Sequence, residues 1–357
     1  MINQIIDNIV KDSIALLKAM IEIPSLSREE KMIADYLEEK FSDWGLRPFR
    51  SGNNLWMHNA GWTDGRPVIL LNSHIDTVRP AKGWTYDPYK ATQEADRITG
   101  LGSNDAGASV VSLLATFRYF FTQENLPFNL ILCTSAEEEI SGEHGVASVL
   151  EQLGKIDLAI VGEPTQMEIA IAEKGLLVLD CEAKGKAGHA ARNEGENAIY
   201  KAIRDIQIIE NYRFPLESAV LGPVKMTVTQ IEAGQQHNVV PDSCRFVIDV
   251  RTNEHYSNEQ AYRIISGLIH SEVKPRSFRL NSSGINADHP LVQRGIKIGR
   301  KIYGSPTTSD QAVIPYPSIK MGPGDSARSH TADEYILIHE IHDGVVTYIQ
   351  LLEGLMV

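Results

Sequence analysis

The sequence predicts an α/β fold with a mostly parallel sheet flanked by helices, into which a small α+β domain is inserted. Between residues 66 and 175, continuous apolar runs alternate with helical patterns, which is typical of parallel strands covered on both faces. From about residue 176, apolar and polar residues alternate, as they do in half-buried antiparallel strands. The α/β pattern then resumes, so the predicted domains are 1–175 with 284–357, and 176–283.

The elements of the larger domain can be assigned in chain order. The first is an amphipathic helix that stops near Pro24, because charges interrupt its apolar residues every few positions. The others are a strand in PVILLNSHID, a helix in AGASVVSLLATFRYFF, strands in FNLILCTSAEEE and DLAIVGEPT, a helix in HPLVQRGIKIGRKIYG (289–304), a strand and loop in SIKMGPG, and a closing helix in IHEIHDGVVTYIQLLEGL.

The inserted domain should be an antiparallel sheet with two helices on one face. Its predicted strands lie in LLVLDCEAKGKAG, KMTVTQIEAG and CRFVIDVRTN, and its helices in ENAIYKAIRDIQIIENY and NEQAYRIISGLIHSEV. The two chain crossings, near Leu176 and Ser283, are natural hinges.

Length and composition narrow the functional classes. A chain of 357 residues favours two domains, and its formal charge of -12 argues against nucleic acid or an anionic membrane as a partner. No apolar run reaches the roughly 18 residues of a membrane span. The three cysteines are scattered and form no CxxC pair, which suits a reducing compartment. We expect a cytoplasmic protein.

Ionisable residues follow the predicted strands of the larger domain. In open α/β sheets, ligands bind beyond the carboxyl ends of the strands, so these residues should share one rim. Each alone is more often a helix cap or a surface residue, and the three glutamates of TSAEEEISG alone would suit an ordinary helix start. Their occurrence together after several neighbouring strands is what favours a metal or catalytic site. The residues are His74, Asp76, Asp105, Glu137, Glu138, Glu163 and His330.

Two imidazoles and several carboxylates, without thiolates, suit zinc or related metals. A single catalytic zinc takes three protein ligands, so the surplus of candidates favours two metals that share a bridging carboxylate.

Seven motifs, in order, resemble the di-zinc family of aminoacylases, acetylornithine deacetylases and succinyl-diaminopimelate desuccinylases, which also includes carboxypeptidases and dipeptidases. The resemblance covers essentially the whole chain and implies a zinc exopeptidase-like fold. Leu101 stands where the family often has Arg, a departure that concerns the packing of this loop. The motifs are SHIDTV, GLGSNDAGA, TSAEEEISGEHG, VGEPT, GKAGHAAR, NVVPD and GPGDSARSHTADEYI.

The resemblance implies a ligand set for two Zn²⁺ ions, with Co²⁺ or Mn²⁺ as possible substitutes. His74 and Glu163 would hold the first ion, and Glu138 and His330 the second. Asp105 would bridge the two ions.

It also implies roles for residues that bind no metal. Asp76 would accept the imidazole N–H of His74, and Glu137 would be the general base. Glu139 would contribute only its charge, or a contact to one of the ligands. His189 would donate to the oxyanion when the domains close, in many family members across a dimer.

The substrate implied by the resemblance is an N-acyl amino acid. Arg251 and Asn238 match positions that hold its α-carboxylate, and the planar fork of an arginine pairs with a carboxylate at two points. The inserted domain would act as a lid and join two chains into a homodimer.

The predicted reaction is hydrolysis of the amide bond by a water held between two zinc ions. The motifs resemble most closely the acetylornithine and acetylcitrulline deacetylases of arginine biosynthesis, and the leaving acyl group, acetyl or succinyl, stays open. The alternatives are a di- or tripeptidase, or a succinyl-diaminopimelate desuccinylase. A non-catalytic binding protein would have no use for an unliganded Glu137, and a glycosidase would leave both histidines idle.

Overall fold

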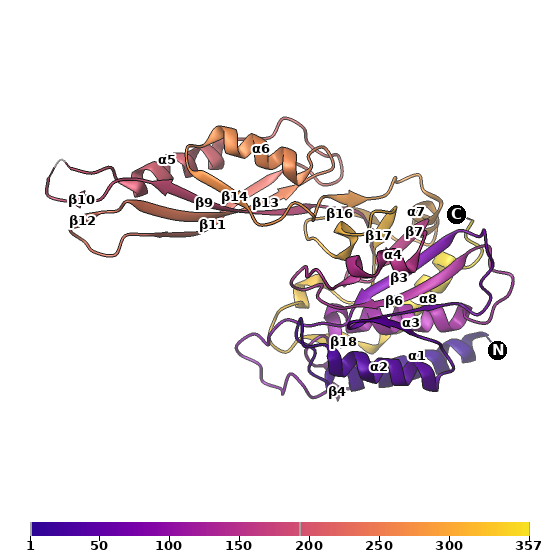
Figure 1. The fold of residues 1–357 in the computed structure, drawn as a ribbon. Helices are drawn as coiled ribbons and strands as arrows, with labels where there is room; N and C mark the ends of the chain where they lie inside the picture. Colours follow the sequence, from indigo (N-terminus) through magenta and orange to yellow (C-terminus); the bar gives the residue numbers. More distant parts are fainter. Residues whose placement is uncertain (1, 193, 357) are drawn as a thin grey trace. The chain divides into compact units, whose positions relative to one another are not determined.

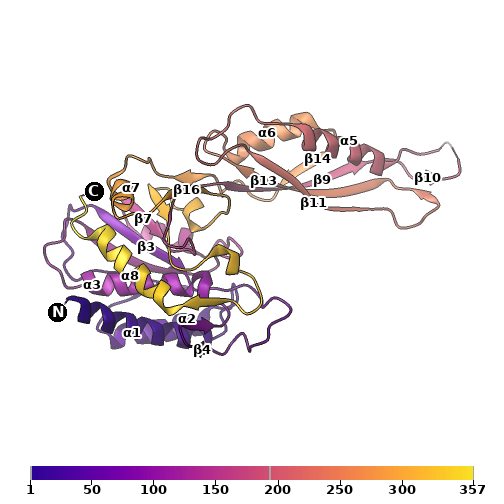
Figure 2. The same ribbon diagram turned by 180° about the vertical axis from the view of Figure 1, so that it is seen from behind.

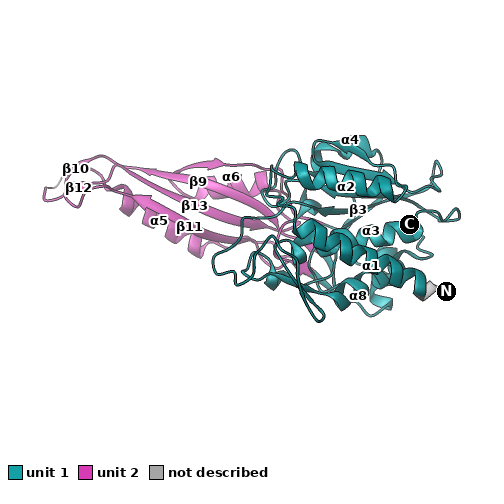
Figure 3. Ribbon diagram, turned by 90° about the horizontal axis from the view of Figure 1, so that it is seen from below, with its two compact units in different colours: residues 1–171, 284–303, 309–357 teal, residues 172–283, 304–308 magenta. Residues whose placement is uncertain are grey.

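The computed structural model describes residues 2–192 and 194–356. It has the predicted α/β fold, with a mostly parallel sheet flanked by helices (Figure 1). The chain divides into two compact units, which are coloured separately in Figure 3. Unit 1 comprises residues 1–171, 284–303 and 309–357, and unit 2 comprises residues 172–283 and 304–308.

The units differ in detail from the predicted domain boundaries. Unit 2 begins at Ala172 instead of Leu176, and it includes residues 304–308. Two hydrogen bonds to Lys174 hold this segment in unit 2. Lys174 N donates to Ser305 O at 3.1 Å, and Thr308 Oγ1 donates to Lys174 O at 2.9 Å.

The main sheet places the carboxyl ends of its central strands on one edge. Its strand order is β1-β2-β6-β3-β7-β17-β8-β15, with β16 beside β8, and β6, β3, β7 and β17 are parallel to their neighbours in this group. Every residue of β3 and β6 is buried, which explains their continuous apolar sequences. The strands are β1 (Phe49–Ser51), β2 (Asn54–His58), β3 (Val68–His74), β6 (Asn129–Ser135), β7 (Leu158–Val161), β8 (Ile169–Glu173), β15 (Ser283–Gly284), β16 (Ile302–Ser305) and β17 (Ser318–Lys320).

Helices α1 (Ile2–Ile21), α3 (Ala108–Phe120) and α8 (Ile338–Leu352) contact one another on one face of this sheet (Figures 1 and 2). Helix α3 also contacts β3 and β6, so it is sandwiched and nearly all of its residues are buried. The other elements of unit 1 are α2 (Lys31–Asp43), α4 (Leu150–Leu153), α7 (Pro290–Lys297), and a small sheet of β4 (Thr92–Glu94), β5 (Arg97–Thr99) and β18 (Tyr335–Leu337).

One predicted helix is shorter than its sequence pattern indicates. The helix expected over 289–304 ends at Lys297, and Gly299 follows in the left-handed region with φ 90°. The chain then becomes extended and β16 pairs with β8. This pairing stops the helix, because the backbone of Lys301 accepts a hydrogen bond from Ile169 N at 2.9 Å.

Unit 2 is a four-stranded antiparallel sheet in the order β11-β13-β9-β14, with two helices on one face (Figure 1). Burial alternates along β9 and β13, as expected for strands with one covered face. A capping box of Ser257 and Gln260 starts the second helix. The elements are β9 (Gly175–Lys184), β10 (Gly188–His189), α5 (Ala198–Asn211), β11 (Lys225–Ala233), β12 (Val239–Val240), β13 (Ser243–Thr252), α6 (Asn258–Leu268) and β14 (Glu272–Pro275).

Among the described residues, no helix has the length and apolarity needed to cross a membrane.

Candidate active site

The candidate site lies at the carboxyl ends of three neighbouring strands of unit 1. His74 is the last residue of β3, the three glutamates follow β6, and Glu163 follows β7. Asp105 lies in the turn before α3, and His330 lies between β17 and β18. Segments far apart in the sequence therefore meet at one edge because their strands are parallel neighbours.

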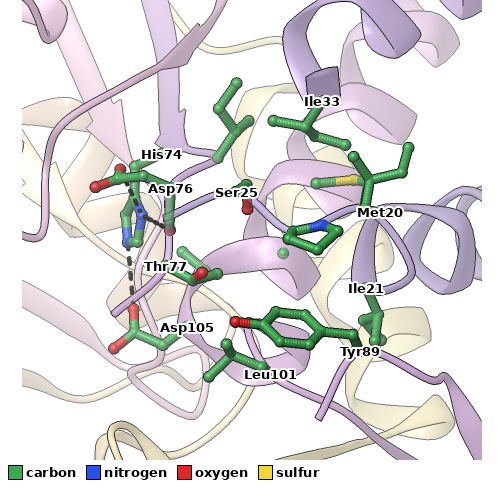
Figure 4. Close-up of a pocket in the computed structure, with 16 residues that line it drawn as sticks. Met20, Ile21, Ser25, Ile33, His74, Asp76, Thr77, Tyr89, Leu101 and Asp105 are labelled. Atoms are coloured by element: carbon green, nitrogen blue, oxygen red, sulfur yellow. Dashed lines mark hydrogen bonds and ion pairs between the residues drawn. The ribbon is translucent and has the colours of Figure 1, made fainter. Parts of the chain in front are cut away.

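His74 occupies the centre of the site and is almost completely buried. Its Nε2 lies 3.2 Å from Asp105 Oδ1, and 3.8 Å from both Glu138 Oε2 and Glu163 Oε1. On the other side of the ring, Nδ1 lies 3.0 Å from the backbone oxygen of Asp76 and 3.4 Å from its carboxylate (Figure 4). The Asp76 contacts orient the ring so that Nε2 faces the carboxylates.

Asp105 stands between the two histidines of the site. Its Oδ1 faces His74, and its Oδ2 lies 3.7 Å from His330 Nε2. His330 Nε2 also lies 2.9 Å from Glu139 Oε2. The two oxygens of one carboxylate thus face two separate groups of possible ligands.

Two clusters of the described residues have side-chain atoms close enough together to hold a metal ion. They are His74 with Glu138 and Glu163, and His74 with Asp105 and Glu139. Within the first cluster, Glu163 Oε1 is buried and has no hydrogen-bond partner among the described residues. An unsatisfied buried carboxylate oxygen aimed at an imidazole nitrogen is what a divalent cation would satisfy, so the residues fit a metal.

The electrostatics agree with this interpretation. Burial, followed by the charge of Asp105, raises the pKa of Glu163 to about 8. Burial, followed by the charge of Glu163, raises the pKa of Glu138 well above its usual value. The carboxylates crowd one another in a dry environment, and a bound cation would remove the penalty on their charged forms.

Asp76 holds the main chain of the glutamate turn as well as His74. Its Oδ1 accepts from Glu138 N at 3.0 Å and its Oδ2 accepts from Glu139 N at 3.1 Å. Ser27 Oγ donates to the same carboxylate at 2.7 Å. One buried carboxylate therefore positions three of the candidate site residues, a larger role than the sequence assigns to Asp76.

The glutamate positions differ from the prediction by one residue. Glu137 adopts a left-handed conformation with φ 55°, and its side chain packs against Gly142, where its Oε2 accepts from His144 N at 3.3 Å. The carboxylate beside His330 belongs to Glu139, not Glu138. This geometry differs from the expected one, in which Glu137 is the general base and Glu138 holds the second ion with His330. Glu139 lies beside His330, and the Glu137 side chain lies against Gly142 and His144. The only hint in the sequence is that three glutamates were available.

Leu101, where the resemblance leads us to expect an arginine, is buried beside the turn that carries Asp105. Its side chain is buried in a small pocket lined by Met20, Ile21 and Tyr89 (Figure 4). Met20 and Ile21 lie at the carboxyl end of α1, so the environment of Leu101 is apolar.

The three predicted residues outside the rim belong to unit 2. His189 pairs with Val239 in the β10–β12 ladder. Asn238 directly precedes β12, and its backbone oxygen accepts from Ala190 N at 3.0 Å. Both His189 and Asn238 are exposed. Arg251 lies on β13 and donates from Nε and Nη2 to Asp249 at 2.8 and 3.0 Å. Its Nη1 lies 3.3 Å from Thr308 Oγ1.

Residues 70–354 match the model of the family described as peptidase family M20/M25/M40. The chain belongs to this family. It is 26% identical to a succinyl-diaminopimelate desuccinylase of Wolbachia pipientis wMel over 96% of this chain and 93% of that protein. It is also 26% identical to an acetylornithine deacetylase of Myxococcus xanthus over 81% of this chain and 80% of that protein.

The fold of this M20/M25/M40 member is similar to the crystal structure of an aminopeptidase from Bacillus cereus ATCC 10987. The TM-score is 0.77 at 20% sequence identity, over 96% of this chain and 98% of that chain. Family membership, together with the deacylase and peptidase relatives, shows that the chain is an amide-hydrolysing enzyme.

Proposed function

We propose that this enzyme removes the acyl group of an N-acyl amino acid with the help of two divalent metal ions. One observation carries the proposal. Asp105 presents one oxygen to His74 Nε2 at 3.2 Å and the other to His330 Nε2 at 3.7 Å, as a bridging carboxylate must.

The ligand assignment follows from which side chains accompany each histidine. His74, Glu163 and Asp105 would hold one ion, while Asp105, Glu139 and His330 would hold the other. Imidazole and carboxylate donors suit Zn²⁺, with Co²⁺ and Mn²⁺ as substitutes. When bound, the ions would acidify a water molecule and polarise the carbonyl of the substrate.

Glu138 is the best candidate for the general base. Its carboxylate lies 3.8 Å from His74 Nε2, and no described side chain donates a hydrogen bond to it within the ordinary distance. It is therefore free to take the proton of the attacking water and pass it to the amide nitrogen. The water oxygen bonds to the carbonyl carbon, the C–N bond breaks, and a carboxylate and an amine leave.

Unit 2 supplies the proposed substrate contacts. His189 would donate to the oxyanion, and Asn238 would bind near the substrate carboxylate. Arg251 would pair with that carboxylate. Because Asp249 already holds two of its donors, we expect the substrate carboxylate to meet the Nη1 side, next to Thr308.

The proposed substrates are acetyl or succinyl derivatives of ornithine or citrulline, which would place the enzyme in arginine biosynthesis. The relatives support a deacylase of either acyl group, since one is named a desuccinylase and another a deacetylase. The similarity in fold to an aminopeptidase keeps a di- or tripeptidase as the second candidate.

We further propose that unit 2 pairs two chains into a homodimer. Strand β11 is an edge of its sheet and exposes Ile231, 56% accessible. Helix α5 exposes Tyr200 and Ile203, at 63% and 41%. An unpaired edge next to exposed apolar side chains favours association with another chain.

The proposal is tested by assaying zinc-loaded protein against acetylornithine, acetylcitrulline, succinylornithine, succinyl-diaminopimelate and a panel of di- and tripeptides. We expect the highest kcat/KM for one of the ornithine or citrulline derivatives. A preference for succinyl-diaminopimelate or peptides would favour the corresponding alternative. Protein that binds two ions but cleaves none of these compounds would contradict the proposed substrate class.

A further inference from the structure

We propose that Glu334 is a positioning residue that shapes the loop carrying Asp105. This inference rests on the proposed function, because it concerns the placement of the bridging carboxylate. Glu334 is 2% exposed and immediately precedes β18. Its carboxylate is hydrogen-bonded to the loop of residues 100–105.

The Glu334 carboxylate accepts three backbone N–H groups from this loop. Oε2 accepts from Gly102 N at 3.0 Å, and Oε1 accepts from Asn104 N and Asp105 N, both at 2.9 Å. The main chain of Glu334 adds a fourth bond, since its carbonyl accepts from Gly100 N at 3.0 Å. One residue thus satisfies most of the amides between Gly100 and Asp105.

The loop needs such an acceptor because its amides are buried and have no strand partner. Gly102 has φ 72°, and an added Cβ would come within 2.6 Å of Thr77 Cγ2, so the chain turns sharply in a confined space. Each buried N–H left without an acceptor would cost on the order of 1–3 kcal/mol. A carboxylate, with two oxygens and no donors, can serve all three.

The same loop is tied to the segment before Glu334 at a second point. Asn104 Nδ2 donates to Asp325 O at 3.1 Å and lies 3.2 Å from Ser329 Oγ, while Asp325 N donates to Asn104 Oδ1 at 3.0 Å. His330 lies between these contacts and Glu334. The segment that carries His330 therefore also determines where Asp105 lies, and Asp105 faces His330 with one oxygen.

The arrangement parallels that of Asp76 on the other side of the site. Asp76 accepts the amides of Glu138 and Glu139, and Glu334 accepts the amide of Asp105 and those of its neighbours. In each case a buried carboxylate holds the main chain of a ligand-bearing loop. A small displacement of either loop would misplace a ligand without changing any ligand.

The test compares Glu334→Gln, Glu334→Asp and the control Asp343→Asn in titrations of metal-free protein with Zn²⁺, followed by calorimetry. Asp343 lies on α8 and pairs with Arg300, so its variant removes a charge without touching the loop. Glutamine keeps the size of the side chain but turns an N–H₂ group toward an amide. Because Asp105 would bridge both ions, we expect both to bind about 10- to 100-fold more weakly in Glu334→Gln.

Glu334→Asp separates position from charge, because it keeps the carboxylate on a shorter side chain that cannot reach all three amides. We expect it to weaken binding as well, and to lower the Tm of the metal-free protein by a few degrees relative to Asp343→Asn, because at least one buried N–H loses its acceptor. At saturating Zn²⁺, kcat should fall while KM is unchanged. Wild-type affinity in Glu334→Asp would overturn the inference, because charge alone would then matter.

Glu334→Gln binding both ions like the wild type would also overturn the inference. If Glu334→Gln does not fold, Glu334→Asp carries the test with the same expected weakening. A wild-type protein that takes up at most one ion would instead contradict the two-metal proposal. The two failures are therefore distinguishable in one set of titrations.

Discussion

The rim of unit 1 and the β10–β12 ladder of unit 2 carry functional candidates of opposite character. On the rim, His74 is 1% exposed, and its loop neighbours are held by buried carboxylates from distant parts of the chain. In unit 2, strands β10 and β12 have only two residues each. His189, in β10, and Asn238, directly before β12, are both exposed. The nearest polar contact of the His189 ring is local, with Ala191 N donating to Nδ1 at 3.1 Å.

A buried, hydrogen-bonded rim and an exposed ladder suit different parts of one reaction. On the rim, hydrogen bonds to Asp76 and Glu334 orient the His74 ring and hold the main chain at Asp105, Glu138 and Glu139. The ladder has two-residue strands and an exposed histidine, as expected of a segment that reaches its working position on closure or association. Changes on the rim can therefore affect catalysis, metal binding or both, whereas changes at His189 and Asn238 should leave metal binding unchanged.

The largest expected effect is on the rim, at the proposed base. Glu138→Gln should lower kcat by about 10²- to 10⁴-fold, the range attributed to a positioned acid/base group, while two metal ions stay bound. Turnover and metal content of the purified variant are the measurements.

Glu137→Gln is the matched control, because the side chain of Glu137 faces His144 N and Gly142. We expect near wild-type turnover. A severe loss in Glu137→Gln together with normal activity in Glu138→Gln would reverse the one-residue correction.

The next effect tests the ladder. His189→Ala should lower kcat by about 10²- to 10³-fold, as loss of an oxyanion donor does, with metal content unchanged. His255→Ala, also in unit 2, serves as a control, since His255 pairs only with Glu254 among the described contacts of its ring.

Subunit exchange sharpens this test. If His189 acts across a dimer, mixing His189→Ala with Glu138→Gln creates one site with both defects and one site with neither. Activity should then return. A mixture that exchanges subunits and stays inactive would show that His189 acts within its own chain.

Removing the metal should affect the rim and the ladder differently, which can be measured without any mutation. Zn²⁺ at about 100 times its Kd should stabilise the metal-free protein by about 2.7 kcal/mol, seen as a higher Tm that a chelator reverses. Hydrogen exchange should slow in the loops around His74, Asp105 and Glu138, and stay unchanged at the β10–β12 ladder. If Zn²⁺ slowed hydrogen exchange equally in the rim loops and in the β10–β12 ladder, the expectation that only the rim responds to metal would be contradicted.

The smallest effect is expected from Asn238, the residue directly before β12. Asn238→Ala removes at most a neutral hydrogen bond to substrate, worth about 0.5–1.5 kcal/mol, so KM should rise roughly 2- to 10-fold with kcat retained. Asn211→Ala, at the end of α5, is the control and should change neither constant. A loss of kcat as large as that of His189→Ala would give Asn238 a role in the chemistry itself.

Much of the fold was predictable because its signals are local. The continuous apolar sequences of β3 and β6 and the alternating ones of β9 and β13 reflect how many faces of each strand are covered. The predicted helix over 289–304 was too long because β16 pairs with β8, and that partner is more than 100 residues away in the chain.

For the candidate site, the sequence sufficed to predict that His74, Asp105 and Glu163 share one rim, since parallel strands end at the same edge. Which glutamates face this rim depends on contacts that form only in the folded chain. Beyond Ser135 the strand's alternation no longer applies, and the left-handed Glu137 turns its own side chain away. That turn is held by Asp76 and by Glu30, whose Oε1 accepts from Glu137 N at 3.2 Å. Because these hydrogen-bond acceptors are remote in the sequence, no local pattern around the glutamates predicts them. The direction of each glutamate side chain is therefore set only in the folded chain.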